Sequence, residues 1–101
     1  MLASAQCDLR SITAFISREV SRASADRWLK GISTRIDSLE STADVWPEAD
    51  ESSSLPLDLR MMLYGKKKQT YRILYEIEDD VVQVHRVRHA AQDSLAADDF
   101  E

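Results

Sequence analysis

The sequence predicts an α+β fold in which an N-terminal helical hairpin packs on an antiparallel sheet of three or more strands. Through residues 4–45 the apolar side chains recur at intervals of three and four, the spacing that places them on one face of a helix. After residue 57 apolar and polar residues alternate in short runs separated by brief polar breaks, the pattern of strands joined by hairpins. At 101 residues the chain is long enough for one domain with one hydrophobic core.

The first helix is predicted over residues 4–19. Its apolar stripe consists of Ala5, Leu9, Ile12, Ile16 and Val20, with Phe15 beside it. Asp8 falls outside the stripe and is predicted to face solvent. We therefore expect this helix to bury one side and to leave the other in water.

The second helix is predicted over residues 24–45. Ser24 is its expected N-cap, and Asp26 is expected in its first turn, where the helix dipole favours a negative charge. Gly31 costs about 1 kcal/mol relative to alanine inside a helix, which predicts that another part of the chain packs closely against it. The helix is expected to end at Trp46, because the residue before a proline is disfavoured in helical geometry.

The second half of the chain is predicted to form a sheet. A polar, acidic loop over residues 47–57 is followed by strands over residues 58–65, 69–78 and 80–89 and by a tail over residues 90–101. One face of the middle strand carries Tyr71, Ile73, Tyr75 and Ile77. The other face carries Arg72, Leu74 and Glu76. Alternation fails in the last strand, which predicts a β-bulge near His85 and Arg86.

Composition excludes several classes of protein. The formal net charge is −5, so the arginines of the last two strands depart from an acidic average. The single cysteine, Cys7, cannot form an internal disulfide and is expected as a buried or half-buried thiol. No apolar run approaches the roughly 20 residues of a membrane span and no signal-peptide pattern opens the chain, which predicts a cytoplasmic protein without membrane association. No phosphate-binding glycine loop or metal-ligand cluster is recognised, so no cofactor and no metal are expected.

Several segments together resemble the RelE/ParE superfamily of toxins from type II toxin–antitoxin modules, which includes plasmid stabilisation proteins. The likeness rests on Ala5-Gln-Cys-Asp-Leu9, Leu59-Arg60, Tyr71-Arg-Ile-Leu-Tyr75, Val84-His-Arg-Val-Arg-His89 and Asp93. It implies the α+β fold predicted above and a small antitoxin partner whose C-terminal segment wraps the toxin. Members usually begin with a strand before the first helix, and that strand is expected to be missing here. The sheet edge left unpaired keeps a homodimer open as an alternative.

The superfamily contains two kinds of activity. RelE-like toxins cleave messenger RNA on the ribosome, using cations that stabilise the phosphorane and a group that moves protons, whereas ParE-like toxins bind DNA gyrase. By resemblance, the basic positions of RelE fall at Arg60, Met62, Arg72 and, after the last strand, Gln92. Because two of these are uncharged and no tyrosine follows Tyr75, the chain resembles ParE more closely than RelE.

We therefore expect a ParE-like toxin that inhibits growth by acting as a DNA gyrase inhibitor, is neutralised by an antitoxin and is not an enzyme. Guanidinium groups bind carboxylates and phosphates, so the expected partner-binding residues are Arg60, Arg72, Arg86 and Arg88. For Arg86 and Arg88 a solvated edge strand is the alternative.

Two other functions stay open at this point. One is a ribosome-dependent mRNA endoribonuclease, in which Arg60 and Arg72 hold the phosphate and His85 or His89 transfers protons. The other is a decayed toxin that retains only antitoxin binding.

Overall fold

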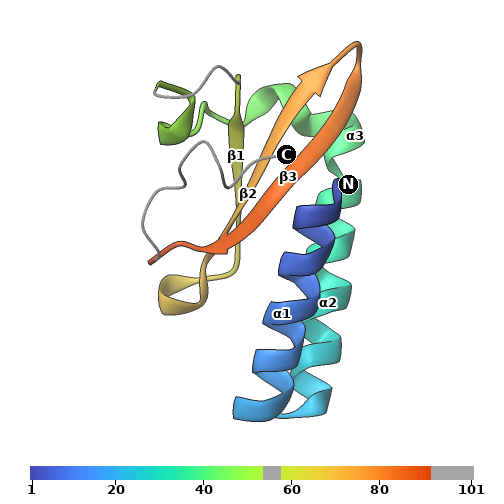
Figure 1. Ribbon diagram of the computed structural model, residues 1–101, viewed down its shortest axis with the longest axis vertical. Helices are drawn as coiled ribbons and strands as arrows, with labels where there is room; N and C mark the ends of the chain where they lie inside the picture. Colours follow the sequence, from blue (N-terminus) through green and yellow to red (C-terminus); the bar gives the residue numbers. More distant parts are fainter. Residues whose placement is uncertain (54–57, 92–101) are drawn as a thin grey trace.

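Helices occupy the first half of the chain and strands the second. The structure is a computed structural model that describes residues 1–53 and 58–91. Its helices are α1 (Ala3–Glu19), α2 (Arg22–Asp37) and α3 (Leu39–Thr42), and its 3-10 turns are η1 (Ala43–Val45), η2 (Asp50–Ser53) and η3 (Lys67–Gln69). Its strands are β1 (Arg60–Tyr64), β2 (Tyr71–Glu78) and β3 (Val81–His89). The α1–α2 hairpin forms one layer and the sheet the other (Figure 1), which confirms the predicted α+β fold.

β2 is the central strand of a three-stranded antiparallel sheet with the order β1-β2-β3. The β2–β3 register shifts between Leu74 and Tyr75. Arg86 pairs with Leu74 and Val84 pairs with Tyr75, so His85 is the extra residue of a bulge. The bulge that the failed alternation predicts is therefore confirmed.

The hydrophobic core lies between the helices and one face of the sheet. Tyr71, Ile73 and Tyr75 are buried and point into it, as their alternation along β2 predicts. The Tyr75 hydroxyl donates a hydrogen bond to the carbonyl oxygen of Ala43. Because a buried tyrosine needs a partner for its polar atom, this bond ties the sheet to the end of the helical layer.

A smaller apolar cluster covers the opposite face of the sheet, which we call the outer face. It contains Ala49, Leu59 and Leu74, with Met61 packed against them. The segment before β1 reaches this face by pairing with the edge of β1: the Met61 N–H donates to the Pro47 carbonyl over 3.0 Å. The first part of the predicted loop therefore packs on the sheet. Predictions for residues 54–57 and 92–101 lie outside the described residues.

The second helix differs from its prediction at both ends. It begins one turn earlier, with Ser21 as the N-cap, whose side-chain oxygen accepts from the Ser24 N–H over 3.0 Å. Asp26 is consequently not in the first turn. The helix also breaks at Ser38, where the side-chain hydroxyl donates to the carbonyl of Arg35 over 2.6 Å. Serine hydroxyls that bond to backbone carbonyls compete with helical geometry, so one predicted helix becomes α2, α3 and η1.

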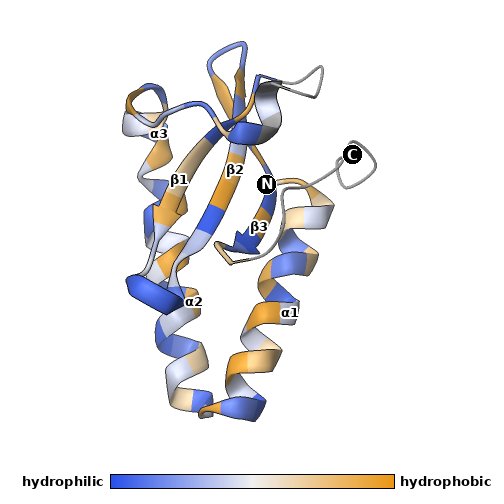
Figure 2. Cartoon of the chain, turned by 90° about the vertical axis from the view of Figure 1, so that its left-hand side faces the viewer, coloured by the Kyte–Doolittle hydropathy of each residue, from blue (hydrophilic) through white to orange (hydrophobic). Residues whose placement is uncertain are grey.

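The apolar stripe of α1 is buried only where the sheet covers it. Ala5 and Leu9 are buried, whereas Val20 is 69% exposed. Figure 1 shows that the lower end of the α1–α2 hairpin extends past the sheet, and in Figure 2 the apolar colouring of α1 continues below that level. Cys7 is exposed, so the prediction of a buried thiol is wrong; it lies on the side of α1 that turns away from Leu9 and the core.

Gly31 has the close neighbour that its position in a helix predicts. A Cβ atom built there would lie 2.0 Å from the Tyr64 hydroxyl oxygen. Trp28 lies beside this contact, with its ring 6.4 Å from that of Tyr64 and 5.1 Å from that of Tyr71. These edge-on aromatic contacts anchor α2 on the sheet. Trp46 also packs against the core.

Candidate functional site

Two of the four predicted arginines lie together on the outer face. Arg72 and Arg88 are directly opposite each other on β2 and β3. Arg72 is only 9% exposed and Arg88 is half-buried. Leu63 of β1 lies opposite Arg72 on its other side and is 42% exposed. The outer face therefore carries two guanidinium groups beside an accessible apolar side chain.

Arg72 and Arg88 occupy paired positions on neighbouring strands of the outer face, and both also interact with other groups of the chain. The Arg72 guanidinium is buried, whereas Arg88 is only half-buried. A guanidinium group donates charge-assisted hydrogen bonds to a carboxylate or phosphate. Arg88, with Arg72 beside it, is therefore the first candidate for partner binding.

Arg60 lies on the other face of the sheet. It is opposite Tyr75, whose side chain points into the core, and directly opposed residues project to the same side. Its Nη1 donates to the Trp46 carbonyl over 2.6 Å and to the Asp44 carbonyl over 3.3 Å. The carbonyl groups at the end of a helical segment need donors, and Arg60 supplies them. The structure therefore separates Arg60 from Arg72.

Arg86 is held at the free edge of β3 by Asp8 of α1. Its Nε and Nη2 donate to the two carboxylate oxygens of Asp8 over 2.7 Å and 2.9 Å. The Val87 N–H also donates to Asp8, over 2.9 Å. The expectation that Asp8 faces solvent is wrong, because its carboxylate takes the place of a neighbouring strand at this edge. Sequence reasoning missed this role because Asp8 and Arg86 are far apart in the sequence and meet only when α1 packs beside β3.

The two histidines have structural partners. His85 is 4% exposed, and its Nε2 lies 3.0 Å from Glu76 Oε1. His89 Nε2 lies 2.6 Å from the Lys68 carbonyl oxygen, and its Nδ1 accepts from the Ala91 N–H over 3.0 Å. With Nδ1 accepting from Ala91, the Nε2 atom is placed to donate to the Lys68 carbonyl. Its ring links the end of β3 to the β1–β2 hairpin.

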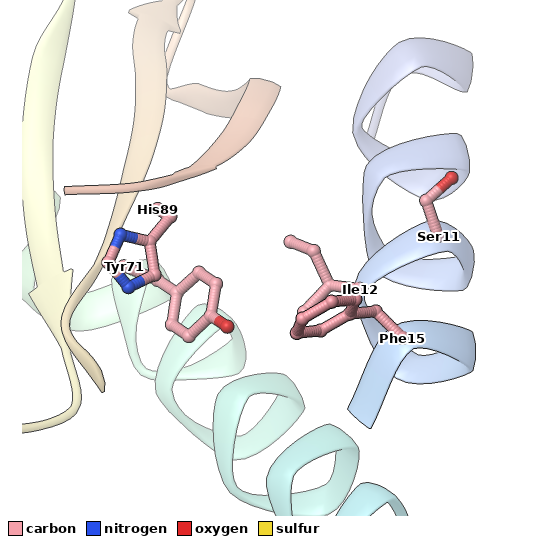
Figure 3. A pocket seen from close by; sticks show the side chains of 5 residues that line it. All are labelled: Ser11, Ile12, Phe15, Tyr71 and His89. Atoms are coloured by element: carbon pink, nitrogen blue, oxygen red, sulfur yellow. The ribbon is translucent and has the colours of Figure 1, made fainter. Parts of the chain in front are cut away.

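A pocket opens between α1 and the lower end of the sheet. It has a volume of about 320 Å³ and is lined by Ser11, Ile12, Phe15, Tyr71 and His89. Figure 3 shows the rings of Tyr71 and His89 on one side and the side chains of Ile12 and Phe15 facing them from α1. Burial raises the pKa of the Tyr71 phenol. The pocket is therefore a mainly apolar cleft whose polar groups are the Ser11 and Tyr71 hydroxyls and the His89 imidazole.

The Tyr75 phenol lies at the junction of β1, β2 and η1. Burial raises its pKa, the nearby Arg60 guanidinium lowers it and the Asp44 carboxylate raises it, with burial as the largest effect.

Within residues 1–53 and 58–91, no group of three or more histidine, cysteine or acidic side chains is placed to hold a metal ion. Over the same residues, none of the helices is long and apolar enough to cross a membrane.

Comparison with known families gives one match. Residues 2–94 match the family model described as "ParE toxin of type II toxin-antitoxin system, parDE". The chain belongs to this ParE toxin family. It is thus a toxin of a type II toxin–antitoxin system, and membership implies an antitoxin partner. The search of curated proteins found no match.

Membership of the ParE family confirms the resemblance drawn from the sequence. The structure pairs Arg72 with Arg88 and places Arg60 on the core side of the sheet. Arg86 bonds to Asp8 and lines one cavity with Asp8 and Arg88. Gln92 and Asp93, which also entered that resemblance, lie outside the described residues. Glu76, the partner of His85, was not singled out from the sequence; its place on the same strand face as Arg72 was the available indication.

Proposed function

We propose that this ParE-family toxin arrests growth by binding DNA gyrase in the cytoplasm, and that its antitoxin neutralises it by binding the outer face. The observation that carries the proposal is that Arg60 and Arg86 are engaged by other parts of the same chain. In-line cleavage of RNA needs several cations and a proton-moving group around one phosphate. Here two arginines bond to backbone carbonyls or to Asp8, which supports binding over phosphodiester chemistry.

The outer face has the chemistry of a protein-binding surface. The half-buried Arg88 supplies donors for carboxylates, the buried Arg72 lies opposite it on β2, and the partly exposed Leu63 supplies an apolar contact on the other side of Arg72. An acidic segment with interspersed apolar residues matches both features. We propose that antitoxin and gyrase compete for this surface, so that bound antitoxin prevents the toxin from binding gyrase. In a plasmid-borne operon the same competition would account for plasmid stabilisation.

Expression in bacteria with and without the antitoxin gene tests the proposal. We expect growth arrest from the toxin alone, relief on co-expression of the antitoxin, and an induced DNA-damage response in arrested cells. Arg88→Gln should abolish arrest, whereas Arg18→Gln, the same change of charge on the exposed part of α1, should leave it intact. Harmless expression of the soluble wild-type chain would contradict the proposal and support a decayed toxin.

One observation supports the RNase alternative. His85 and Glu76 form a histidine–carboxylate pair on the outer face, the side of β2 that also carries Arg72. Such a pair can move protons. Against this, His85 is too deeply buried to reach a phosphate. Mapping of transcript ends in arrested cells decides between the two: cuts within translated codons that disappear in His85→Gln would replace gyrase binding with ribosome-dependent cleavage.

A further inference from the structure

The upper end of the molecule carries a groove with an apolar floor and an acidic rim. Two adjoining cavities, of about 370 Å³ and 350 Å³, share the residues Leu39, Glu40, Asp80 and Val82. Together they run from the free edge of β3, past α3, to the β2–β3 turn. This groove lies on neither the outer face nor the pocket beside α1. We call it the acidic groove.

The floor of the acidic groove is apolar and partly accessible. Leu39 forms its buried base. Ile77 and Val81 line it from the β2–β3 hairpin and are 41% and 52% exposed. Exposed large apolar side chains that gather in a concave site mark a surface that another molecule covers.

The charged residues of the rim indicate that such a molecule carries positive charge. Among the described residues, no lysine or arginine lines the groove. Four carboxylates line it: Asp37, Glu40, Asp44 and Asp80. All four side chains are exposed. Negatively charged carboxylates around an apolar floor attract lysine or arginine side chains, whose aliphatic stems can lie on that floor.

The edge of β3 adds backbone groups to the same groove. The Leu2 N–H donates to the Val84 carbonyl over 3.0 Å, so the backbone of Val84 faces away from β2. Alternation along an antiparallel strand then turns the N–H and carbonyl of Val82 outward as well. Within the described part of the chain, no other segment pairs with β3 above Leu2. An extended peptide can therefore bond to Val82 while its side chains enter the groove.

We propose that the acidic groove binds a short extended segment of a partner protein in which basic and apolar residues alternate. Val82 supplies the backbone bonds, Leu39 and Ile77 the apolar contact, and Asp37 and Glu40 the charge. The Arg72–Arg88 surface attracts acidic segments, so the acidic groove recognises a different segment. This proposal is independent of whether gyrase is the cellular target, because its test measures peptide binding alone.

The test uses the full chain and a short capped peptide in which lysine and valine alternate. Titration followed by NMR should shift the amide signals of Val82, Ile77 and Leu39 and should slow hydrogen exchange at the Val82 amide. Raised salt should weaken binding. A peptide in which glutamate replaces lysine should not bind.

Two double variants separate the groove from the general acidity of the chain. Asp37→Asn with Glu40→Gln should weaken the lysine peptide by about five- to tenfold, the effect of losing two exposed ion pairs. Glu19→Gln with Asp26→Asn makes the same charge change at the other end of the helical hairpin and should leave affinity unaltered. Equal binding to both double variants, or shifted amides confined to other surfaces, overturns the proposal. So does a free chain that is already a dimer with a protected Val82 amide, because a second copy then fills the edge.

Discussion

Arg60 of β1 and Arg86 of β3 bond to segments outside the sheet at its two edges, whereas Arg72 and Arg88 occupy paired positions on β2 and β3. At the edges each guanidinium group bonds to its own chain: Arg60 to carbonyls that follow α3, and Arg86 to Asp8 of α1. On the outer face two guanidinium groups oppose each other across β2 and β3. An arginine on a toxin strand is therefore not by itself evidence for a binding or catalytic role.

The largest effect is expected from Asp8→Ala at the β3 edge. It removes the acceptor of two Arg86 bonds and of the Val87 N–H, and leaves a partly buried guanidinium without its carboxylate. We expect the free energy of unfolding to fall by about 3 kcal/mol. Urea denaturation measures this, with Glu19→Ala as the control for loss of an exposed carboxylate on the same helix. A loss no greater than that of the control would show that Asp8 does not hold the edge.

A somewhat smaller effect is expected from Arg60→Gln at the β1 edge. The variant loses the charged donor to the Trp46 and Asp44 carbonyls, which should cost about 2 kcal/mol. The same change removes the cation that lowers the pKa of Tyr75, so that pKa should rise further. Ultraviolet titration of the phenols and urea denaturation give the two readouts. An unchanged Tyr75 titration would place the guanidinium away from the phenol.

Alkaline pH should weaken the sheet through Tyr75 itself. Burial raises the folded pKa of this phenol above its ordinary value of 10.0, so the folded state favours the neutral form. The resulting stability is present below about pH 10 and is lost as the pH rises through the folded pKa. Melting temperatures measured from pH 8 to about pH 11 should fall at the upper end, and less so in Tyr75→Phe. An equal fall in melting temperature with pH for the wild-type chain and for Tyr75→Phe would show that Tyr75 does not cause this pH dependence.

The smallest effect on stability is expected on the outer face. Arg88 is half-buried and glutamine keeps a polar side chain at its position, so the free energy of unfolding should change by no more than about 1 kcal/mol. Thermal and urea denaturation measure it beside Asp8→Ala. A loss as large as that at the edge would mean that Arg88 supports the fold in the way that Arg86 does, and the contrast between the two regions would disappear.

Most of the fold was predictable because it depends on local pattern. The three- and four-residue spacing of apolar positions gave both helices, and the two-residue alternation of β2 gave its buried face. The failed alternation in β3 gave the bulge. The break at Ser38 was not predictable from spacing, since hydroxyl-to-carbonyl bonds interrupt the helix without changing its apolar period.

The site was less predictable because it depends on contacts between distant segments. Asp8 and Arg86 are far apart in the sequence, and the helical period placed Asp8 on the solvent side. Alternation along β2 showed that Arg72 points away from the core, but it did not show that Arg60 projects to the opposite face of the sheet, the side of Tyr75. That difference follows from the β1–β2 register, which the loop length alone does not fix.

The most direct test of the outer-face account is a DNA supercoiling assay with purified gyrase and purified toxin. We predict that the wild-type chain inhibits gyrase, that an excess of antitoxin restores supercoiling, and that folded Arg88→Gln is inactive while Arg18→Gln inhibits like the wild type. Full gyrase activity in the presence of folded wild-type toxin, or equal inhibition by Arg88→Gln, would contradict the account.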